Sequence, residues 1–256
     1  MNKTMKSLEN KSAIITGAGS GMGRSMALLF ASEGAKVVVA DLKADRVEAV
    51  VKEIASKNGT AIGFAGNIAK EEDVNKLMDA CMAKYGTIDV LVNDAGIMDD
   101  FTPVADVTDE LWNRVLGVNL FGPFYTCRLA VRQMLKQGKG AIVNVSSIGG
   151  LQGARAGAAY TASKHGLAGL TKNIGFMYGT KGIRCNAIAP GGMNTNIMEG
   201  ASPNKFGFER ISTGMASNLR MAEPAEVAEL ALFLASDKAS NINGTVVVAD
   251  GGWTAF

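Results

Sequence analysis

The sequence predicts an α/β fold in which one doubly wound parallel sheet of about seven strands is covered by helices on both faces. Short β-branched runs alternate with longer helical patterns, which is typical of βαβ units. The short runs are nearly all apolar rather than alternating, as expected for strands that are buried on both faces. No linker, low-complexity tract or repeat divides the 256 residues. We therefore expect a single domain over residues 1–256.

The expected elements follow one another in a regular order along the chain. The strands are predicted from short β-branched, apolar runs, which lie at residues 13–16, 36–40, 61–65, 90–93, 141–145, 184–188 and 246–249. The helices are predicted from apolar residues at helical spacing, which lie at residues 22–33, 46–58, 71–85, 108–137 (with an interruption), 159–179 and 226–235. Because strands and helices alternate, we expect the strands to run mostly parallel.

One segment, residues 190–222, fits neither pattern. It combines prolines and glycines with large apolar side chains: Pro190, Gly191, Gly192, Met193, Met198, Gly200, Pro203, Phe206, Gly207, Phe208, Gly214 and Met215. An irregular insertion longer than about 15 residues in a compact domain is usually functional. We expect a lid over the substrate, and the alternative is a pair of short helices that completes the core.

Composition and charge argue against several classes of function. The chain has 26 Lys and Arg against 24 Asp and Glu, a formal charge of +2, and no local basic cluster, so we expect no nucleic-acid partner. The widely spaced cysteines Cys81, Cys127 and Cys185 fit neither a disulfide framework nor a zinc motif. The polar residues 1–11 precede only a short apolar run, so we expect no signal peptide and no membrane span. The sequence therefore predicts a soluble, cytoplasmic protein.

The chain contains a single histidine, His165, and this limits the chemistry. A catalytic triad or metal centre that needs two imidazoles cannot form, and we expect no metal site. Any catalysis must therefore use Ser, Tyr, Lys or carboxylate side chains.

A glycine-rich turn joins the first predicted strand to the first predicted helix. Its sequence, GAGSGMG at residues 17–23, permits positive φ and close approach of a pyrophosphate, whose charge the helix N-terminus stabilises. Asp41 ends the second strand, 24 residues after Gly17, where an acidic residue binds the adenosine ribose hydroxyls and repels a 2′-phosphate. The turn predicts a Rossmann-type dinucleotide site with NAD as the cofactor. Lys43, two residues beyond Asp41, leaves NADP as an alternative.

A Tyr-x-x-x-Lys pair, Tyr160 and Lys164, lies in a helical pattern of small residues. At positions i and i+4 the two side chains share one face, so the ammonium can lower the pKa of the phenol and produce a proton donor. Ser147 follows the strand at 141–145, at the carboxyl end where open α/β sheets bind ligands. His165 directly follows Lys164 and does not share its face, so we interpret it as structural.

These features together make the chain resemble the short-chain dehydrogenase/reductase family from about residue 8 to residue 253. The resemblance rests on these motifs: Thr16-Gly17-x-x-x-Gly21-x-Gly23, Asn93-Asp94-Ala95-Gly96, Asn119, Ser147, Tyr160-x-x-x-Lys164 and Pro190-Gly191. It implies a catalytic tetrad of Asn119, Ser147, Tyr160 and Lys164. In this scheme Tyr160 exchanges a proton with the substrate, and Ser147 hydrogen-bonds the substrate oxygen. Lys164 holds the nicotinamide ribose, and Asn119 holds a water that leads protons to solvent.

The resemblance also implies the cofactor contacts. They are Gly17, Ser20, Gly21, Met22, Gly23, Asp41, Asn67, Ile68, Asn93, Gly96, Tyr160, Lys164, Pro190, Gly191 and Thr195. Two positions depart from the usual family pattern: Asn67-Ile68 stands where Asp-Val is common, and Asp94 replaces the second Asn of Asn-Asn-Ala-Gly. The Asn67 amide can still donate and accept hydrogen bonds. The negative charge of Asp94 is either neutralised by a backbone cap or weakens cofactor binding.

The predicted function is that of an NAD(H)-dependent oxidoreductase that interconverts a secondary alcohol and its ketone by direct hydride transfer. One alternative is an NADPH-dependent 3-oxoacyl-thioester reductase of fatty acid synthesis, and another is a non-catalytic dinucleotide-binding sensor. A hydroxysteroid or other bulky alcohol suits the Met- and Phe-rich segment, and a small diol or sugar is also compatible with it. By resemblance we expect a homotetramer. We interpret Arg155, between Ser147 and Tyr160, as a solvated surface residue, and the alternative is contact with an anionic group of the substrate.

Overall fold

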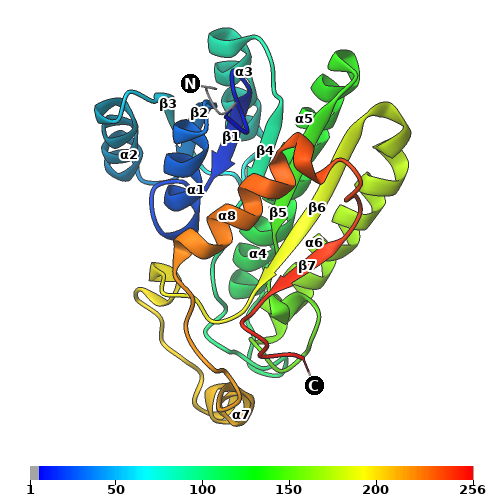
Figure 1. Cartoon of the computed structure of the whole chain (residues 1–256). Coiled ribbons are helices and arrows are strands. Elements are labelled where there is room, and N and C mark those ends of the chain that lie inside the picture. Colours follow the sequence, from blue (N-terminus) through cyan, green and yellow to red (C-terminus); the bar gives the residue numbers. More distant parts are fainter. Residues whose placement is uncertain (1–5, 256) are drawn as a thin grey trace.

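A parallel sheet of seven strands forms the centre of the molecule (Figure 1), in the order β3-β2-β1-β4-β5-β6-β7. Its strands are β1 (Ser12–Thr16), β2 (Lys36–Asp41), β3 (Thr60–Ala65), β4 (Val90–Asn93), β5 (Gly140–Val145), β6 (Ile183–Pro190) and β7 (Val246–Ala249). The structure is a computed structural model that describes residues 6–255; residues 1–5 and 256 of the predicted domain lie outside the described residues. The predicted fold class is confirmed. Strand β6 extends past the predicted 184–188 to Pro190, which pairs with Ala249.

Helices cover both faces of the sheet. One layer consists of α1 (Gly21–Ser32), α2 (Ala44–Ser56) and α8 (Pro224–Ala235). The opposite layer contains α3 (Glu71–Tyr85), α5 (Gly122–Gln137) and α6 (Ala158–Tyr178). Successive residues of a strand point to opposite faces, so Ile14 belongs to one core and Ile15 to the other. This is why the strands read as continuous apolar runs in the sequence.

The predicted helix at 108–137 is interrupted at residues 117–121. Helix α4 (Asp109–Leu116) begins after Thr108, whose hydroxyl accepts a hydrogen bond from the Leu111 amide at 3.2 Å. A π-helical turn (Gly117–Phe121) then leads directly into α5. Such turns widen a helix locally and are frequent at functional sites. This one carries Asn119, which is fully buried.

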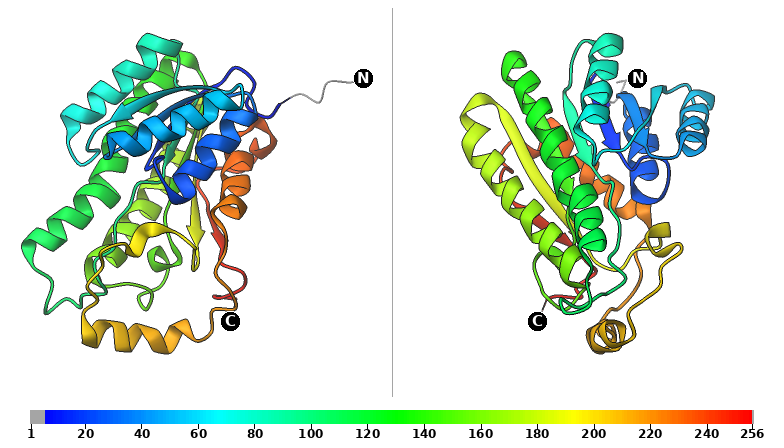
Figure 2. Two further views of the ribbon diagram at one scale, coloured as in Figure 1. Left: turned by 90° about the vertical axis from the view of Figure 1, so that its left-hand side faces the viewer. Right: turned by 180° about the vertical axis from the view of Figure 1, so that it is seen from behind.

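Residues 190–222 contain a short 3₁₀ turn (Asn196–Met198) and α7 (Lys205–Met215). Figure 2 shows α7 at one end of the molecule, away from the two helical layers. Only Gly207 and Ile211 of α7 are buried, and neither belongs to a main core cluster. The segment therefore does form short helices, but they do not complete the core.

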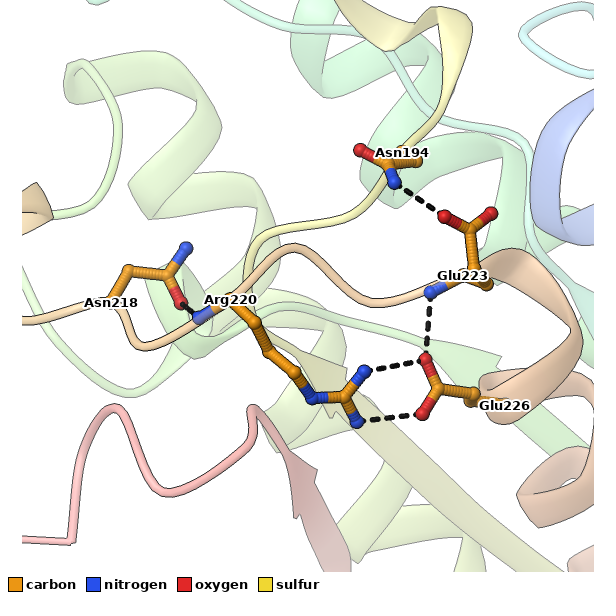
Figure 3. Close-up of polar contacts among 5 residues, drawn as sticks. All are labelled: Asn194, Asn218, Arg220, Glu223 and Glu226. Carbon is orange, nitrogen blue, oxygen red and sulfur yellow. Dashed lines mark hydrogen bonds and ion pairs between the residues drawn. The ribbon is translucent and has the colours of Figure 1, made fainter.

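The two ends of this segment lie side by side (Figure 3). Met193 pairs with Ala222 in an isolated parallel bridge, and the Asn194 backbone N–H donates to the Ala222 carbonyl at 3.0 Å. The Asn194 side-chain amide donates to the Glu223 carboxylate at 2.5 Å. The Arg220 guanidinium makes two hydrogen bonds to Glu226, at 2.6 and 2.8 Å, in the first turn of α8. The segment is thus fixed at its base, while Phe206 and Phe208 on α7 are 62% and 42% exposed. None of the helices within residues 6–255 is long and apolar enough to cross a membrane.

Candidate active site

A cleft of about 340 Å³ opens at the carboxyl ends of β1, β2 and β4. It brings together predicted cofactor residues from five separate parts of the chain, namely Gly17, Ser20, Gly21, Met22, Asp41, Asn67, Ile68, Gly96 and Thr195. Open parallel sheets bind ligands at this edge, where loops from several strands converge. The cleft therefore has the position that the glycine-rich turn predicts.

The backbone conformation and the close packing of the turn require glycine. Gly17 and Gly21 have φ of +68° and +52°, which other L-residues rarely adopt. A Cβ at Gly17 would lie 2.8 Å from the Ala95 backbone, and one at Gly23 would collide with the Gly17 carbonyl oxygen. A Cβ at Gly21, by contrast, would meet only Thr195, at 3.5 Å. The turn and the N-terminus of α1 form an open backbone cradle, which fits a dinucleotide phosphate.

Asp41 lies at the end of β2, where the sequence predicts it. One of its carboxylate oxygens accepts a hydrogen bond from the Gly19 amide at 3.0 Å, and the other accepts one from the Lys43 amide at 3.1 Å. Lys43 and Arg46 also line the cleft, and Arg46 forms an ion pair with Glu199 at 3.1 Å. Sequence reasoning missed Arg46, although its position five residues after Asp41 was a readable signal. A carboxylate and two cationic side chains therefore lie together at this end of the cleft.

The predicted catalytic residues lie together in the loop after β5, on α6 and on the π turn. The Lys164 ammonium donates to the Val145 carbonyl at 2.8 Å and lies 5.6 Å from the centre of the Tyr160 ring. The Ser147 hydroxyl accepts a hydrogen bond from the Gly149 amide at 3.0 Å and lies near enough to Tyr160 to lower the pKa of its hydroxyl. A Cβ at Gly96 would lie 3.4 Å from Lys164 Nζ and 3.5 Å from Asn119 Oδ1, so these groups border the cleft residue Gly96.

Asn119 connects three parts of this cluster. Its Oδ1 accepts a hydrogen bond from the Ile97 amide at 2.9 Å, and its Nδ2 donates to the Ile97 carbonyl at 3.0 Å. The same Nδ2 lies 3.2 Å from the Ser163 hydroxyl on α6. Asn119 thus ties the loop after β4 to the helix that carries Tyr160 and Lys164.

Burial dominates the protonation of the cluster. It raises the pKa of Tyr160 to about 12, against the opposing effect of the Ser147 hydrogen bond. It lowers the pKa of Lys164 to about 8, and the negative charge of Asp94 opposes this change. The pKa of Tyr160 is therefore raised and not lowered as the sequence predicts, because loss of solvation is the largest influence on it and the Lys164 ammonium donates to the Val145 carbonyl.

A buried carboxylate, Asp99, holds the start of α6 and was missed by sequence reasoning. It accepts hydrogen bonds from the amides of Gly157 at 3.0 Å, Tyr160 at 2.9 Å and Phe101 at 3.2 Å. Burial raises the pKa of Asp99, and these amides oppose the shift. Negative charge is favourable at a helix N-terminus. Asp99 lies in a loop without a motif, so nothing in the sequence marked it.

Some predicted residues do not line the cleft. The Asn93 side chain points into the core, where it accepts from Thr126 at 2.7 Å and donates to Asn144 at 2.9 Å. Pro190 pairs with β7, and a Cβ at Gly191 would lie 2.8 Å from the Asp250 side chain. These residues shape the edge of the sheet, with no side chain directed at a ligand.

His165 and Arg155 lie outside the cleft. His165 is exposed and hydrogen-bonds the Thr161 carbonyl at 2.9 Å, on a different side of α6 from buried Lys164. Arg155 is not a solvated surface residue, because it donates to the Gly214 carbonyl at 3.0 Å and stacks 4.5 Å from the centre of the Trp253 ring. It links the loop after β5 to the 190–222 segment. Within residues 6–255 no group of three or more His, Cys, Asp or Glu side chains could hold a metal ion.

Known proteins are similar to this chain over nearly its whole length. The family described as enoyl-(acyl carrier protein) reductase matches residues 17–254. The 3beta-hydroxysteroid dehydrogenase 2 of Eggerthella lenta is 41% identical over 251 residues, which cover 97% of this chain and 96% of that protein. The 3-oxoacyl-acyl-carrier-protein reductase of Thermotoga maritima is 40% identical over 248 residues, which cover 96% and 98%.

A third relative and a solved structure extend the comparison. Cyclohexanol dehydrogenase of an Acinetobacter species is 38% identical over 257 residues and covers 100% of both chains. The crystal structure of a candidate NAD(P)-dependent gluconate 5-dehydrogenase from Beutenbergia cavernae, with NADP at low occupancy, is 36% identical and has a TM-score of 0.88. It covers 98% of this chain and 100% of that chain. The matches span the cleft, the loop after β5 and α6 together.

Proposed function

The chain belongs to the short-chain dehydrogenase/reductase family, and we propose that it interconverts a secondary alcohol and its ketone with NAD(H) at a Ser147–Tyr160–Lys164 centre. Its relatives include two alcohol dehydrogenases and a 3-oxoacyl reductase, so the chain is an oxidoreductase for alcohol and ketone substrates. The observation that carries the proposal is the meeting of these three side chains beside a cleft that fits a dinucleotide. A protein that only bound dinucleotides would not need them together.

Each residue of the centre has a separate task. When bound, the nicotinamide donates or accepts the hydride. In reduction, the Tyr160 hydroxyl donates its proton to the substrate oxygen and becomes a phenolate; in oxidation, the phenolate takes the proton from the alcohol. The Ser147 hydroxyl donates a hydrogen bond to the same oxygen, an interaction worth about 2.7–4 kcal/mol where negative charge develops. Lys164 stabilises the phenolate through its positive charge and holds the ribose.

Asn119 holds the backbone and the helix next to the Ser147–Tyr160–Lys164 centre. Its amide fixes the Ile97 backbone and Ser163, as described above. Its Oδ1 has a second lone pair, which we assign to a water that connects Lys164 to solvent. The remaining cofactor contacts are those of the cleft, with Gly23, Asn93, Pro190 and Gly191 as backbone supports.

NAD(H) is the proposed cofactor because of Asp41. Its carboxylate is held by the Gly19 and Lys43 amides at the point where β2 ends. A carboxylate there accepts hydrogen bonds from ribose hydroxyls and repels a 2′-phosphate. Lys43 and Arg46 support NADP(H) as the second candidate, although the Arg46 charge is already paired with Glu199.

The proposed substrates are cyclic secondary alcohols. Two relatives are named for a 3beta-hydroxysteroid and for cyclohexanol. The 190–222 segment, which we propose as the lid, presents exposed apolar side chains, among them Met198, Phe206 and Leu219. They suit a bulky apolar ring. The 3-oxoacyl-thioester reductase remains the rival because of the Thermotoga maritima relative.

We further propose a cytoplasmic homotetramer. The three cysteines are free and buried, which suits a reducing compartment. Exposed aromatic side chains lie on and next to α5 and on α6, including Phe121, Phe124 and Phe176. Apolar faces of this kind are typical of subunit contacts. The molecular mass in solution, measured by light scattering, tests this proposal.

The test of the function is a matrix of initial rates. Cyclohexanol, a 3β-hydroxysteroid, a small diol and a 3-oxoacyl thioester are each assayed with NAD(H) and with NADP(H). We expect the highest kcat/KM for a cyclic alcohol with NAD. If NADPH-dependent reduction of the thioester has the highest kcat/KM, both the proposed substrate class and the proposed cofactor are wrong. Dinucleotide binding without turnover of any substrate would favour a sensor.

A further inference from the structure

Asp94 places a carboxylate inside the dinucleotide cleft. It follows β4 and lines the cleft together with Gly17 and Gly96. Its amide donates to the Thr16 hydroxyl at 3.2 Å, which fixes the backbone. Its Oδ1 is buried and has no hydrogen-bond partner within the described chain. A buried acceptor without a partner is costly, so this oxygen calls for an explanation.

The other carboxylate oxygen faces the first turn of α1. A Cβ at Gly23 would lie 2.8 Å from Asp94 Oδ2, and the Gly23 amide stabilises the charged carboxylate. Gly23 is the third residue of α1, whose amide has no carbonyl partner within the helix. Asp94 therefore adds negative charge at the helix terminus that forms the phosphate cradle.

The charges around Asp94 come from three elements. Lys164 on α6 favours the charged carboxylate, whereas Asp41 on β2 disfavours it, and α1 contributes only the Gly23 amide. The Tyr160 hydroxyl, also on α6, is affected by the Asp94 charge. The other charged residues of the cleft are Lys43, Arg46 and Glu199. Burial is the largest influence and raises the pKa of Asp94 to about 7, so a small change in surroundings changes its charge near neutral pH.

A bound dinucleotide brings two further negative charges to the same helix terminus. Like charges in a site of low polarity raise each other's pKa, and a carboxylate then takes up a proton. We propose that Asp94 binds a proton from solvent when NAD(H) binds, so that it is a neutral acid in the complex. Oδ1 gains a proton, and with it the ability to donate a hydrogen bond. This inference rests on the proposed dinucleotide site.

Proton uptake by Asp94 makes NADH affinity depend on pH. When the pKa of a group in the protein rises on ligand binding, the protein binds the ligand most tightly at a pH where that group is already protonated. The dissociation constant of NADH should therefore increase as the pH rises through the pKa of free Asp94, by up to about tenfold per pH unit. Asp94→Asn carries no charge, so this part of the pH dependence is lost, and at about pH 8 the variant binds NADH more tightly than the wild type.

The direct test is infrared difference spectroscopy of NADH binding at about pH 8, where a carboxyl with a pKa near 7 is mostly ionised. We expect a carboxylic-acid carbonyl band to appear on binding in the wild type and in Asp79→Asn, a control on the exposed face of α3. The band should be missing in Asp94→Asn. Lysine protonation gives no such band, so Lys164 cannot mimic the result.

Calorimetry of the wild type gives a second measurement that needs no variant. NADH is titrated at the same pH in PIPES and in imidazole, which differ in ionisation enthalpy, and the difference gives the number of protons taken up. Binding without proton uptake, or a band that persists in Asp94→Asn, would overturn the inference alone. If NADH does not bind at all, the proposed function fails as well.

Discussion

Asp99→Asn tests whether a buried carboxylate positions Tyr160 for proton transfer. The Asp99 carboxylate accepts hydrogen bonds from the amides of Gly157, Tyr160 and Phe101. Asparagine has nearly the same shape but only one acceptor oxygen. Its NH₂ group must face an amide N–H, so at least one hydrogen bond at the start of α6 is lost.

The magnitude follows from the contacts that are lost. One hydrogen bond to a charged group contributes about 1.5–3 kcal/mol, and a charge at a helix N-terminus contributes about 0.3–1 kcal/mol. Burial raises the pKa of Asp99, so removing the charge also removes part of a desolvation cost. We expect the free energy of unfolding to fall by about 1–2 kcal/mol. We expect kcat to fall about tenfold, which corresponds to about 1.4 kcal/mol of transition-state positioning.

The assay that separates positioning from stability is the pH profile of kcat for alcohol oxidation. The Asp99 charge raises the pKa of Tyr160, so its removal lowers that pKa. The rising limb of the profile, where Tyr160 loses its proton, should move to lower pH in Asp99→Asn. Asp100→Asn is the control, because asparagine tolerates its φ of +54°. A folded Asp99→Asn with the wild-type kcat and profile would refute the reasoning.

Two further substitutions test the cofactor cleft. Asp41→Ser should relax the preference for NAD(H) toward NADP(H), because it removes the charge that repels a 2′-phosphate. The preference is measured as the ratio of kcat/KM for the two cofactors. An unchanged ratio would contradict the role of Asp41. Gly23→Ala should raise the dissociation constant of NADH by about 5- to 100-fold, because the added Cβ overpacks the Gly17 carbonyl at a cost of about 1–3 kcal/mol. In the control Gly153→Ala the Cβ meets nothing within 4 Å, so binding that weakens equally in both variants would argue against the cradle.

The sheet was predictable because its signal is local. A run such as 36–40 must be apolar throughout when helices cover both of its faces, and the helical patterns between the runs leave little choice of topology. The predicted strand stops before Pro190, because proline disrupts most strands. In the structure β6 ends at Pro190, a position where proline is tolerated. The π turn could be expected only as an interruption, since its position depends on how Asn119 meets Ile97.

The site was only partly predictable. Motif spacing was enough for Tyr160, Lys164 and the turn, because their separation along a helix or loop fixes their geometry. Asp99 and Arg155 could not be found this way, since their partners lie 58 and 59 residues away in sequence. The Tyr160 pKa depends on burial, which no local pattern reveals.

Replacement of the proposed proton donor tests the central claim most directly. Tyr160→Phe removes one hydroxyl from a buried ring and leaves the cleft intact, and Tyr178→Phe on the same helix is its control. NADH binding, followed by fluorescence, and turnover of a cyclic alcohol are measured on both variants. We predict that Tyr160→Phe binds NADH with a dissociation constant like that of the wild type and loses about 10³-fold or more in kcat. A Tyr160→Phe enzyme that turns over at the rate of Tyr178→Phe would contradict the account.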